Sequence, residues 1–237
     1  MNVNDPQKEL ELLLSNRDLA GKSLCLHSCC APCSSYCMLY LSCFFRITVY
    51  FDNPNITEEA EYRKRADELR RLVDAYNRAA DPALSDTGYE SFDFGQRGEK
   101  HPELVTWIRE QFSGQRYPIT YEEATFDEER FFRMAKGKED APERGERCRA
   151  CYGMRLADTE KFATEMGADF FATTLTLSPL KDAAAINDIG SRLQKPEGAV
   201  YLPTDFKKKG GYLCSILLSE MFHLYRQNYC GCIYSRR

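Results

Sequence analysis

Short apolar runs alternate with longer segments of helical periodicity along the chain. The apolar runs are rich in β-branched and aromatic residues, which is typical of buried strands. The strands predicted in this way cover residues 23–27, 47–51, 169–175 and 200–202. Elsewhere apolar positions recur three or four residues apart, which indicates amphipathic helices. These predicted helices cover residues 34–43, 57–80, 101–112, 127–136, 148–166, 178–193 and 213–224.

This alternation of strands and helices predicts an α/β fold, in which a parallel sheet carries helices on both faces. We expect one such domain over residues 20–237, after an N-terminal extension at 1–19. Residues 81–118 are punctuated by Gly and Pro, which predicts an insertion. Ligands bind such sheets at the carboxyl ends of the strands. The loop at 28–33, directly after the first predicted strand, is therefore a candidate site.

Composition places the chain among ordinary globular proteins. Of its 237 residues, 43% are hydrophobic and 29% charged, and the formal net charge of −4 gives no general indication of nucleic-acid binding. The N-terminus has no apolar signal-peptide core. The least charged stretch, residues 24–45, contains Pro32 and six cysteines, which argues against a membrane span. We expect a cytoplasmic protein with no membrane partner.

Cysteine is the residue type that points to chemistry. The chain has 11 cysteines and no secretion signal, so they are expected to be reduced thiols that bind metals, catalyse or pack in the core. Three groups stand out, and their spacing lets each group direct its sulfurs to one site. They are Cys29-Cys30 with Cys33, the C-x-x-C pair Cys148 and Cys151, and the C-x-C pair Cys230 and Cys232.

Zinc, an iron–sulfur cluster and a dithiol redox centre all fit these groups by ligand type. An adjacent Cys-Cys pair is unusual at zinc sites, which favours a cluster. Six or seven ligand-grade cysteines exceed one four-coordinate site, which favours a second metal or a redox-active pair. The remaining cysteines and all three histidines are predicted to be structural: Cys25, Cys37, Cys43, Cys214, His27, His101 and His223.

Five segments, taken together and in order, resemble the epoxyqueuosine reductase QueH family. The resemblance spans about residues 20–235. The segments read HSCCAPC at 27–33, NPNI at 53–56, RCRACYGMRL at 147–156, TTLTLSP at 173–179 and YRQNYCGC at 225–232.

The resemblance implies a fold related to the adenine nucleotide α-hydrolase-like (HUP) group. It implies a [4Fe–4S] cluster on the Cys-Cys pair and the C-x-x-C pair, and a second centre at the C-x-C pair, where catalysis is expected. That second centre is either a mononuclear iron beside the cluster or a redox-active disulfide, and Cys33 is a candidate further ligand of such an iron. The cluster ligands fall on Cys29, Cys30, Cys148 and Cys151, and the second centre on Cys230 and Cys232.

The implied reaction removes the epoxide oxygen of epoxyqueuosine in the tRNA anticodon loop. The partners are this tRNA and an electron donor that the sequence does not identify; the oligomeric state is also open. Basic and aromatic residues near the cysteines are candidates for RNA binding and stacking. The candidates are Lys207 to Lys209, Arg236, Arg237, Tyr212 and Tyr229, with Asp52 and Tyr36 as candidate proton donors.

Two other functions remain open. An ATP-dependent tRNA sulfurtransferase of the same fold group would need a Ser-Gly-Gly-x-Asp-Ser loop after the first strand, where this chain has Ser-Cys-Cys-Ala-Pro-Cys. A zinc-stabilised, non-enzymatic tRNA-binding domain would use the same cysteines. Metal content separates it from a cluster enzyme, because the zinc protein would be colourless.

Overall fold

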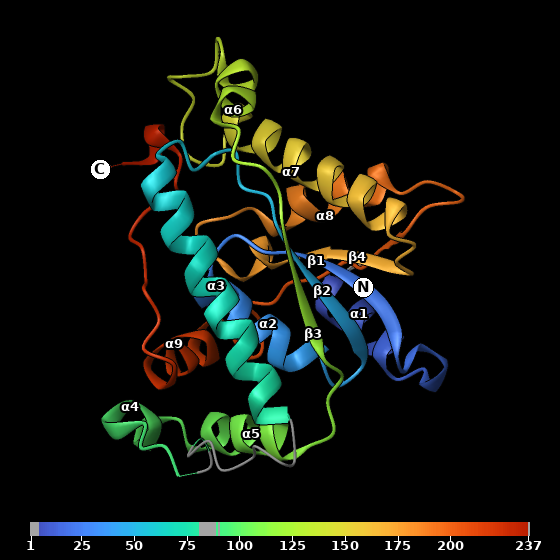
Figure 1. The fold of residues 1–237 in the computed structure, drawn as a ribbon, viewed down its shortest axis with the longest axis vertical. Helices are drawn as coiled ribbons and strands as arrows, with labels where there is room; N and C mark the ends of the chain where they lie inside the picture. Colours follow the sequence, from blue (N-terminus) through green and yellow to red (C-terminus); the bar gives the residue numbers. More distant parts are fainter. Residues whose placement is uncertain (1–4, 81–88, 90, 237) are drawn as a thin grey trace.

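A single sheet of five parallel strands runs through the protein (Figure 1). The computed structural model describes residues 5–80, 89 and 91–236. The strand order is β3-β2-β1-β4-β5. The strands are β1 (Lys22–His27), β2 (Phe45–Phe51), β3 (Ile119–Glu123), β4 (Phe170–Thr173) and β5 (Val200–Tyr201). The predicted α/β fold with a parallel sheet is thus confirmed, and it is consistent with a HUP-like domain.

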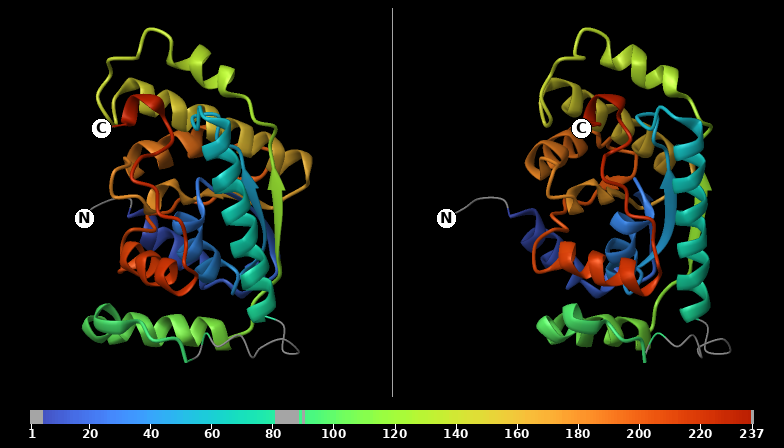
Figure 2. Two further views of the ribbon diagram at one scale, coloured as in Figure 1. Left: turned by 60° about the vertical axis from the view of Figure 1, so that its left-hand side comes forward. Right: turned by 90° about the vertical axis from the view of Figure 1, so that its left-hand side faces the viewer.

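Helices cover both faces of the sheet, as Figure 2 shows. One face carries α2 (Ala31–Leu41), α3 (Glu59–Ala80), α5 (Pro102–Ser113) and α9 (Gly211–Met221), with α1 (Pro6–Leu14) at its margin. The other carries α7 (Glu146–Glu165) and α8 (Ala183–Leu193), with α6 (Glu128–Ala135) packed on α7. The remaining elements are α4 (Gly95–Lys100), η1 (Arg17–Leu19), η3 (Thr174–Leu177) and η4 (Ile233–Ser235). Among the helices described, none is both long and apolar enough to span a bilayer.

The strand order places a ligand-binding position between β1 and β4. The chain moves outward from β1 through β2 and β3, and then returns to the other side of β1 with β4 and β5. At such a reversal the loops that leave two adjacent strands diverge to opposite faces, and a crevice opens at the carboxyl ends. The loops concerned are the cysteine loop that follows β1 and the segment that follows β4.

The structure differs from the local predictions in two missed elements and in the starts of two helices, of which α2 begins at Ala31 and not near residue 34. The edge strand β3 and the helix α1 were not predicted. The helix expected from residue 178 begins only at Ala183, where the Asp182 side chain accepts the N-cap hydrogen bond from the Ala185 N–H. Residues 178–182 instead form a turn at the carboxyl edge of the sheet. The predicted insertion at 81–118 lies partly outside the described residues, and its described part includes α4 and α5.

Gly211, at the start of α9, is required for packing. A Cβ at this position would overlap the Phe206 carbonyl oxygen and lie 2.6 Å from the Tyr36 ring. We expect Gly211→Ala to lower the free energy of unfolding by about 1–3 kcal/mol, because the backbone and a buried ring must both move. Gly153→Ala, on α7, is the control: its Cβ meets nothing within 4 Å, and alanine favours a helix. Thermal unfolding should show a lower midpoint for Gly211→Ala alone; equal midpoints would contradict the packing argument.

Candidate metal and substrate site

The loop after β1 gathers three thiols. Cys30 is the N-cap of α2 and Cys33 lies in its first turn. The sulfurs of Cys29, Cys30 and Cys33 all lie within 4.8 Å of one another, and the Cys29 and Cys30 sulfurs are 3.7 Å apart. This spacing suits ligands of one tetrahedral ion, since sulfurs that sit about 2.3 Å from a metal are separated by roughly 3.8 Å. Among the described residues this is the only group of three or more His, Cys, Asp and Glu ligand atoms so closely spaced.

A second group of thiols forms beside the first. Cys148 and Cys151 lie in the first two turns of α7, and the C-terminal segment brings Cys230 and Cys232 against them. Together these four residues line a small cavity of about 30 Å³. The structure therefore brings the C-x-x-C and C-x-C pairs together, and it places Cys33 with Cys29 and Cys30.

The segment after β2 holds the C-x-C pair in place. The Asn55 side-chain amide donates a hydrogen bond to the Cys230 carbonyl oxygen at 2.9 Å. Gly231 adopts a φ of 98°, and a Cβ there would lie 2.6 Å from the Ile56 side chain. Only glycine fits such a position without strain. The NPNI segment and the C-x-C pair are thus one structural unit, although about 175 residues separate them.

A larger cavity of about 630 Å³ opens on the same site. Its volume is in the range of cavities that bind small organic ligands. Cys29, Cys33 and Cys230 line it, together with Tyr212 and Tyr229. Five cations also line it, whereas Glu143 is the one carboxylate among the described lining residues. These cations are Arg65, Arg155, Lys181, Arg226 and Arg236.

In each thiol group one sulfur is prepared to carry negative charge. Hydrogen bonds from Cys30 and Cys33 hold the pKa of Cys29 well below its usual range, and the bond to Cys29, together with burial, raises the pKa of Cys30 to about 11. A hydrogen bond from Cys232 likewise lowers the pKa of Cys230. Thiolates are the form that binds metals. The Thr174 hydroxyl adds a donor at 3.6 Å from the Cys29 sulfur.

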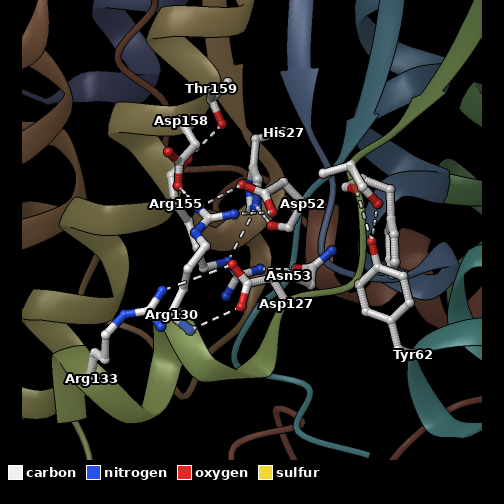
Figure 3. A network of polar contacts seen from close by, with 12 residues as sticks. His27, Asp52, Asn53, Tyr62, Asp127, Arg130, Arg133, Arg155, Asp158 and Thr159 are labelled. Atoms are coloured by element: carbon white, nitrogen blue, oxygen red, sulfur yellow. Dashed lines mark hydrogen bonds and ion pairs between the residues drawn. The ribbon is translucent and has the colours of Figure 1, made fainter. Parts of the chain in front are cut away.

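Arg155 is a buried cation, and Figure 3 shows it in a polar network with His27 and Asn53. Its Nε donates to His27 Nε2 at 3.2 Å, and its Nη2 donates to the Asn53 side-chain oxygen. It makes no ion pair with any carboxylate in the described part of the chain, and it lines both cavities. Because His27 Nε2 accepts from Arg155, its Nδ1 donates to Thr173 Oγ1, 2.8 Å away, and the imidazole is neutral.

Lys181 lies in the turn between η3 and α8, where it lines both cavities. Its side chain is half-buried. Burial lowers the pKa of Lys181, but the nearby sulfurs of Cys29, Cys230 and Cys33 raise it more strongly, and the net result is a pKa above the ordinary value. The amine is therefore a charged ammonium at neutral pH.

Asp52, a candidate proton donor, faces away from the cavities. Figure 3 shows its carboxylate beside Arg130 of α6, to which it is bound at 3.4 Å, and Arg130 also pairs with Asp158 of α7. Asp52 lines neither cavity. The two acids share one arginine, so this network attaches α6 to α7 and to the end of β2 rather than contacting substrate. Tyr36, the other candidate, packs against Tyr40 and lines neither cavity.

Asp158 gives the network a pH dependence. Burial, then the charge of Asp52, raises the pKa of Asp158 to about 6, against the attraction of Arg130 and Lys161. A raised carboxyl pKa means that the folded protein holds a proton which the unfolded chain has lost, so stability falls as pH rises from about 4 to about 6. Asp158→Asn cannot ionise. We expect its unfolding free energy, relative to wild type, to increase between about pH 4 and about pH 6 in urea titrations; a constant difference would contradict the shift.

Comparison with known proteins identifies the family. The family model described as epoxyqueuosine reductase QueH matches residues 24–103 and 106–237. The chain is 37% identical over 215 residues to the epoxyqueuosine reductase QueH of Streptococcus pyogenes serotype M1, covering 91% of this chain and 71% of that protein. It is 36% identical over 221 residues to that of Staphylococcus epidermidis, covering 92% and 78%. The chain belongs to the QueH family. The resemblance inferred from the five segments is thereby confirmed.

The QueH match covers all seven predicted ligand cysteines, but the predicted RNA-binding lysines lie elsewhere. Lys207, Lys208 and Lys209 line neither cavity, and they pair with acids of the 205 turn and of α1. Tyr229 lines the larger cavity, with the guanidinium groups of Arg65 and Arg236 at 5.1 and 4.9 Å from its ring centre. Arg237 lies outside the described residues.

Arg155 and Lys181 are functional candidates that sequence reasoning missed in this QueH chain. Arg155 lies four residues after Cys151 and hence on the same face of α7. That spacing was the available signal. No local signal in the sequence marked Lys181. Its position follows from the pairing of β4 with β1, which brings the turn at 178–182 beside the loop that follows β1.

Proposed function

We propose that the protein is an epoxyqueuosine reductase, which converts epoxyqueuosine to queuosine in the anticodon loop of tRNA. The observation that carries this is the QueH family match over nearly the whole chain. The site agrees with it, because a cavity large enough for a flipped-out nucleoside adjoins seven thiols at the ligand-binding edge of the sheet. The arginine-lined walls suit a polyanionic substrate.

We further propose that Cys29, Cys30, Cys148 and Cys151 hold a [4Fe–4S] cluster. Cys230 and Cys232 would form a second centre beside it, either a mononuclear iron, with Cys33 as a candidate further ligand, or a redox-active disulfide between the two. A buried polar atom and the chemistry of the ligands support a bound group. The Asn55 side-chain oxygen is buried with no hydrogen-bond partner, and it lines the small cavity. The residues are also of the right chemical kind, since thiolates are the usual ligands of such clusters.

The charge of the site supports an anionic centre in particular. Arg155 is buried without a carboxylate ion pair among the described residues, and it lines both cavities beside the thiols. A buried cation is costly unless it is paired. Thiolates around a cluster carry net negative charge, which Arg155 would balance.

The chemistry of the proposed reaction sets what the residues must do. Both carbon–oxygen bonds of the epoxide break, a carbon–carbon double bond forms, and water leaves after uptake of two electrons and two protons. Bound at the cysteines, the cluster would supply electrons singly. The protein residues hold the nucleoside in the cavity, with Tyr212 available to stack on the base and the arginines available to bind phosphates.

Metal analysis tests the cofactor proposal. The protein is purified without oxygen, and iron, sulfide and zinc are assayed beside a visible spectrum. We expect iron and sulfide near cluster stoichiometry with broad absorbance near roughly 400 nm, as for thiolate-bound clusters. Zinc without sulfide, in protein never exposed to oxygen, would contradict the cluster and favour the zinc-stabilised tRNA-binding domain.

Complementation tests the activity. The gene is expressed in a bacterial strain that lacks its own epoxyqueuosine reductase, and the nucleosides of its tRNA are analysed by mass spectrometry. We expect queuosine to appear and epoxyqueuosine to fall. A strain that accumulates only epoxyqueuosine, while holding soluble, iron-loaded protein, would contradict the proposed function.

A further inference from the structure

Lys181 differs from the other cations of the larger cavity, because its nitrogen has no hydrogen-bond or ion-pair partner among the described residues. Each of the other four is held. Arg65 and Arg236 pair with Glu61 and Glu58, and Arg226 donates to the Ser215 carbonyl oxygen. An ammonium has three N–H donors. Those of Lys181 remain available to a molecule in the cavity.

The position of Lys181 is equally distinctive. It lines the larger cavity, which would hold the nucleoside, and also the small cavity among Cys148, Cys151, Cys230 and Cys232. Cys29 and Cys230, which belong to the two thiol groups, line the larger cavity with it. The ammonium therefore stands where substrate and redox centre must meet.

We propose that Lys181 is a catalytic residue, whose ammonium donates a hydrogen bond to the epoxide oxygen and stabilises the negative charge that gathers on it as the carbon–oxygen bonds break. The inference rests on the proposed function, since the epoxide is the substrate of that reaction. Fixed donors aimed at an oxygen that gains charge are among the largest contributions to enzymatic rates. Arg155 also lines this cavity, but its Nε and Nη2 already donate to His27 and Asn53, whereas no donor of the Lys181 ammonium is used by a described residue.

The role of Lys181 leaves the reaction balance unchanged. The two electrons come from two equivalents of an external one-electron reductant, and the two protons come from solvent. The oxygen leaves as water, and the double bond forms between the two former epoxide carbons. Lys181 remains an ammonium throughout, so its contribution is electrostatic.

Binding measurements on two tRNAs, with wild type and variant, test the hydrogen bond from Lys181 to the epoxide oxygen separately from turnover. Oxidised, iron-loaded protein without reductant is titrated with tRNA that carries epoxyqueuosine and with tRNA that carries queuosine, which lacks only the epoxide oxygen. We expect wild type to prefer the epoxide form about tenfold, as one charged hydrogen bond allows, and Lys181→Met to lose the preference. Lys161→Met, an exposed lysine of α7, should keep it.

Turnover gives the second readout. Lys181→Met should lower kcat about 100-fold with a smaller change in KM, and Lys181→Arg should restore part of the rate. Iron content and the electron paramagnetic resonance spectrum should match wild type. If Lys181→Met loses iron, Lys181→Gln provides a second neutral variant for the same binding measurements.

The outcomes separate the inference from the proposed function. Wild type that never converts epoxyqueuosine would refute the function, and the inference with it. Wild type that turns over, beside a Lys181→Met protein that keeps both the epoxide preference and the rate, would overturn the inference alone. A slow variant with an unchanged preference and a shifted midpoint potential would also overturn it, because Lys181 would then act on the centre and not on the substrate.

Discussion

Replacing Cys148 with serine should give a folded protein that has lost most of its iron and at least about 100-fold of its turnover. Residues that only orient metal ligands already contribute about 10–100-fold to metal affinity or activity. Loss of a ligand itself should therefore cost more. Cys148 lies half-buried in the first turn of α7, where serine is sterically close to cysteine. The metal-free variant should therefore unfold within about 0.5 kcal/mol of the metal-free wild type.

Cys43→Ser is the matched control for this loss. Cys43 is also half-buried and unpaired, but it lines neither cavity and its thiol donates to the Gln111 side-chain oxygen at 3.2 Å. A serine hydroxyl retains that hydrogen bond. Iron content, visible spectrum and turnover should match wild type. Full iron content in Cys148→Ser, or equal losses in the two variants, would show that Cys148 is not a ligand.

Replacing Arg155 with methionine should destabilise the iron-loaded protein far more than the metal-free protein. In the loaded protein the variant leaves the anionic centre without its buried cation, and breaking a buried charge pair costs about 3–5 kcal/mol. In the metal-free protein it leaves the Asn53 side-chain oxygen unpaired, which costs about 1–3 kcal/mol. His27 keeps a hydrogen-bond partner in the variant, because its Nε2 can donate instead to the Asp52 carbonyl oxygen, 3.2 Å away.

Anaerobic urea unfolding of the loaded and metal-free forms measures this difference. Arg149→Met is the control on the same helix, since Arg149 is exposed and pairs with Asp182 at 3.8 Å. We expect it to change either form by no more than about 0.5 kcal/mol. If Arg155→Met destabilises both forms equally, then the arginine balances no bound anion, and its role is structural.

The fold was predictable where the hydrophobic pattern reflects burial on both faces. β1 and β2 lie inside the sheet, and their segments at 24–26 and 47–51 are mostly apolar. β3 was missed because it is an edge strand, and its sequence alternates apolar residues with solvent-facing polar ones. The helix at 178 was misplaced because Ser-Pro is a common helix start, whereas here both residues belong to the turn that carries Lys181.

The site was predictable in its residues but not in its grouping. Spacing alone singled out the three cysteine groups. The placement of Cys33 depends on α2 beginning at Ala31 and not near residue 34, which puts Cys33 in the first turn beside Cys29 and Cys30. The meeting of the C-x-x-C and C-x-C pairs depends on the C-terminal segment crossing the start of α7. Such contacts arise from topology and leave no local pattern.

The most direct test of the whole account is a single turnover in vitro. Anaerobic, iron-loaded protein is reduced chemically and mixed with tRNA that carries epoxyqueuosine, and the nucleosides are then analysed by mass spectrometry. The account predicts that epoxyqueuosine loses one oxygen atom to give queuosine, in step with oxidation of the protein. Reduced, iron-loaded protein that binds this tRNA but leaves the epoxide intact would contradict it.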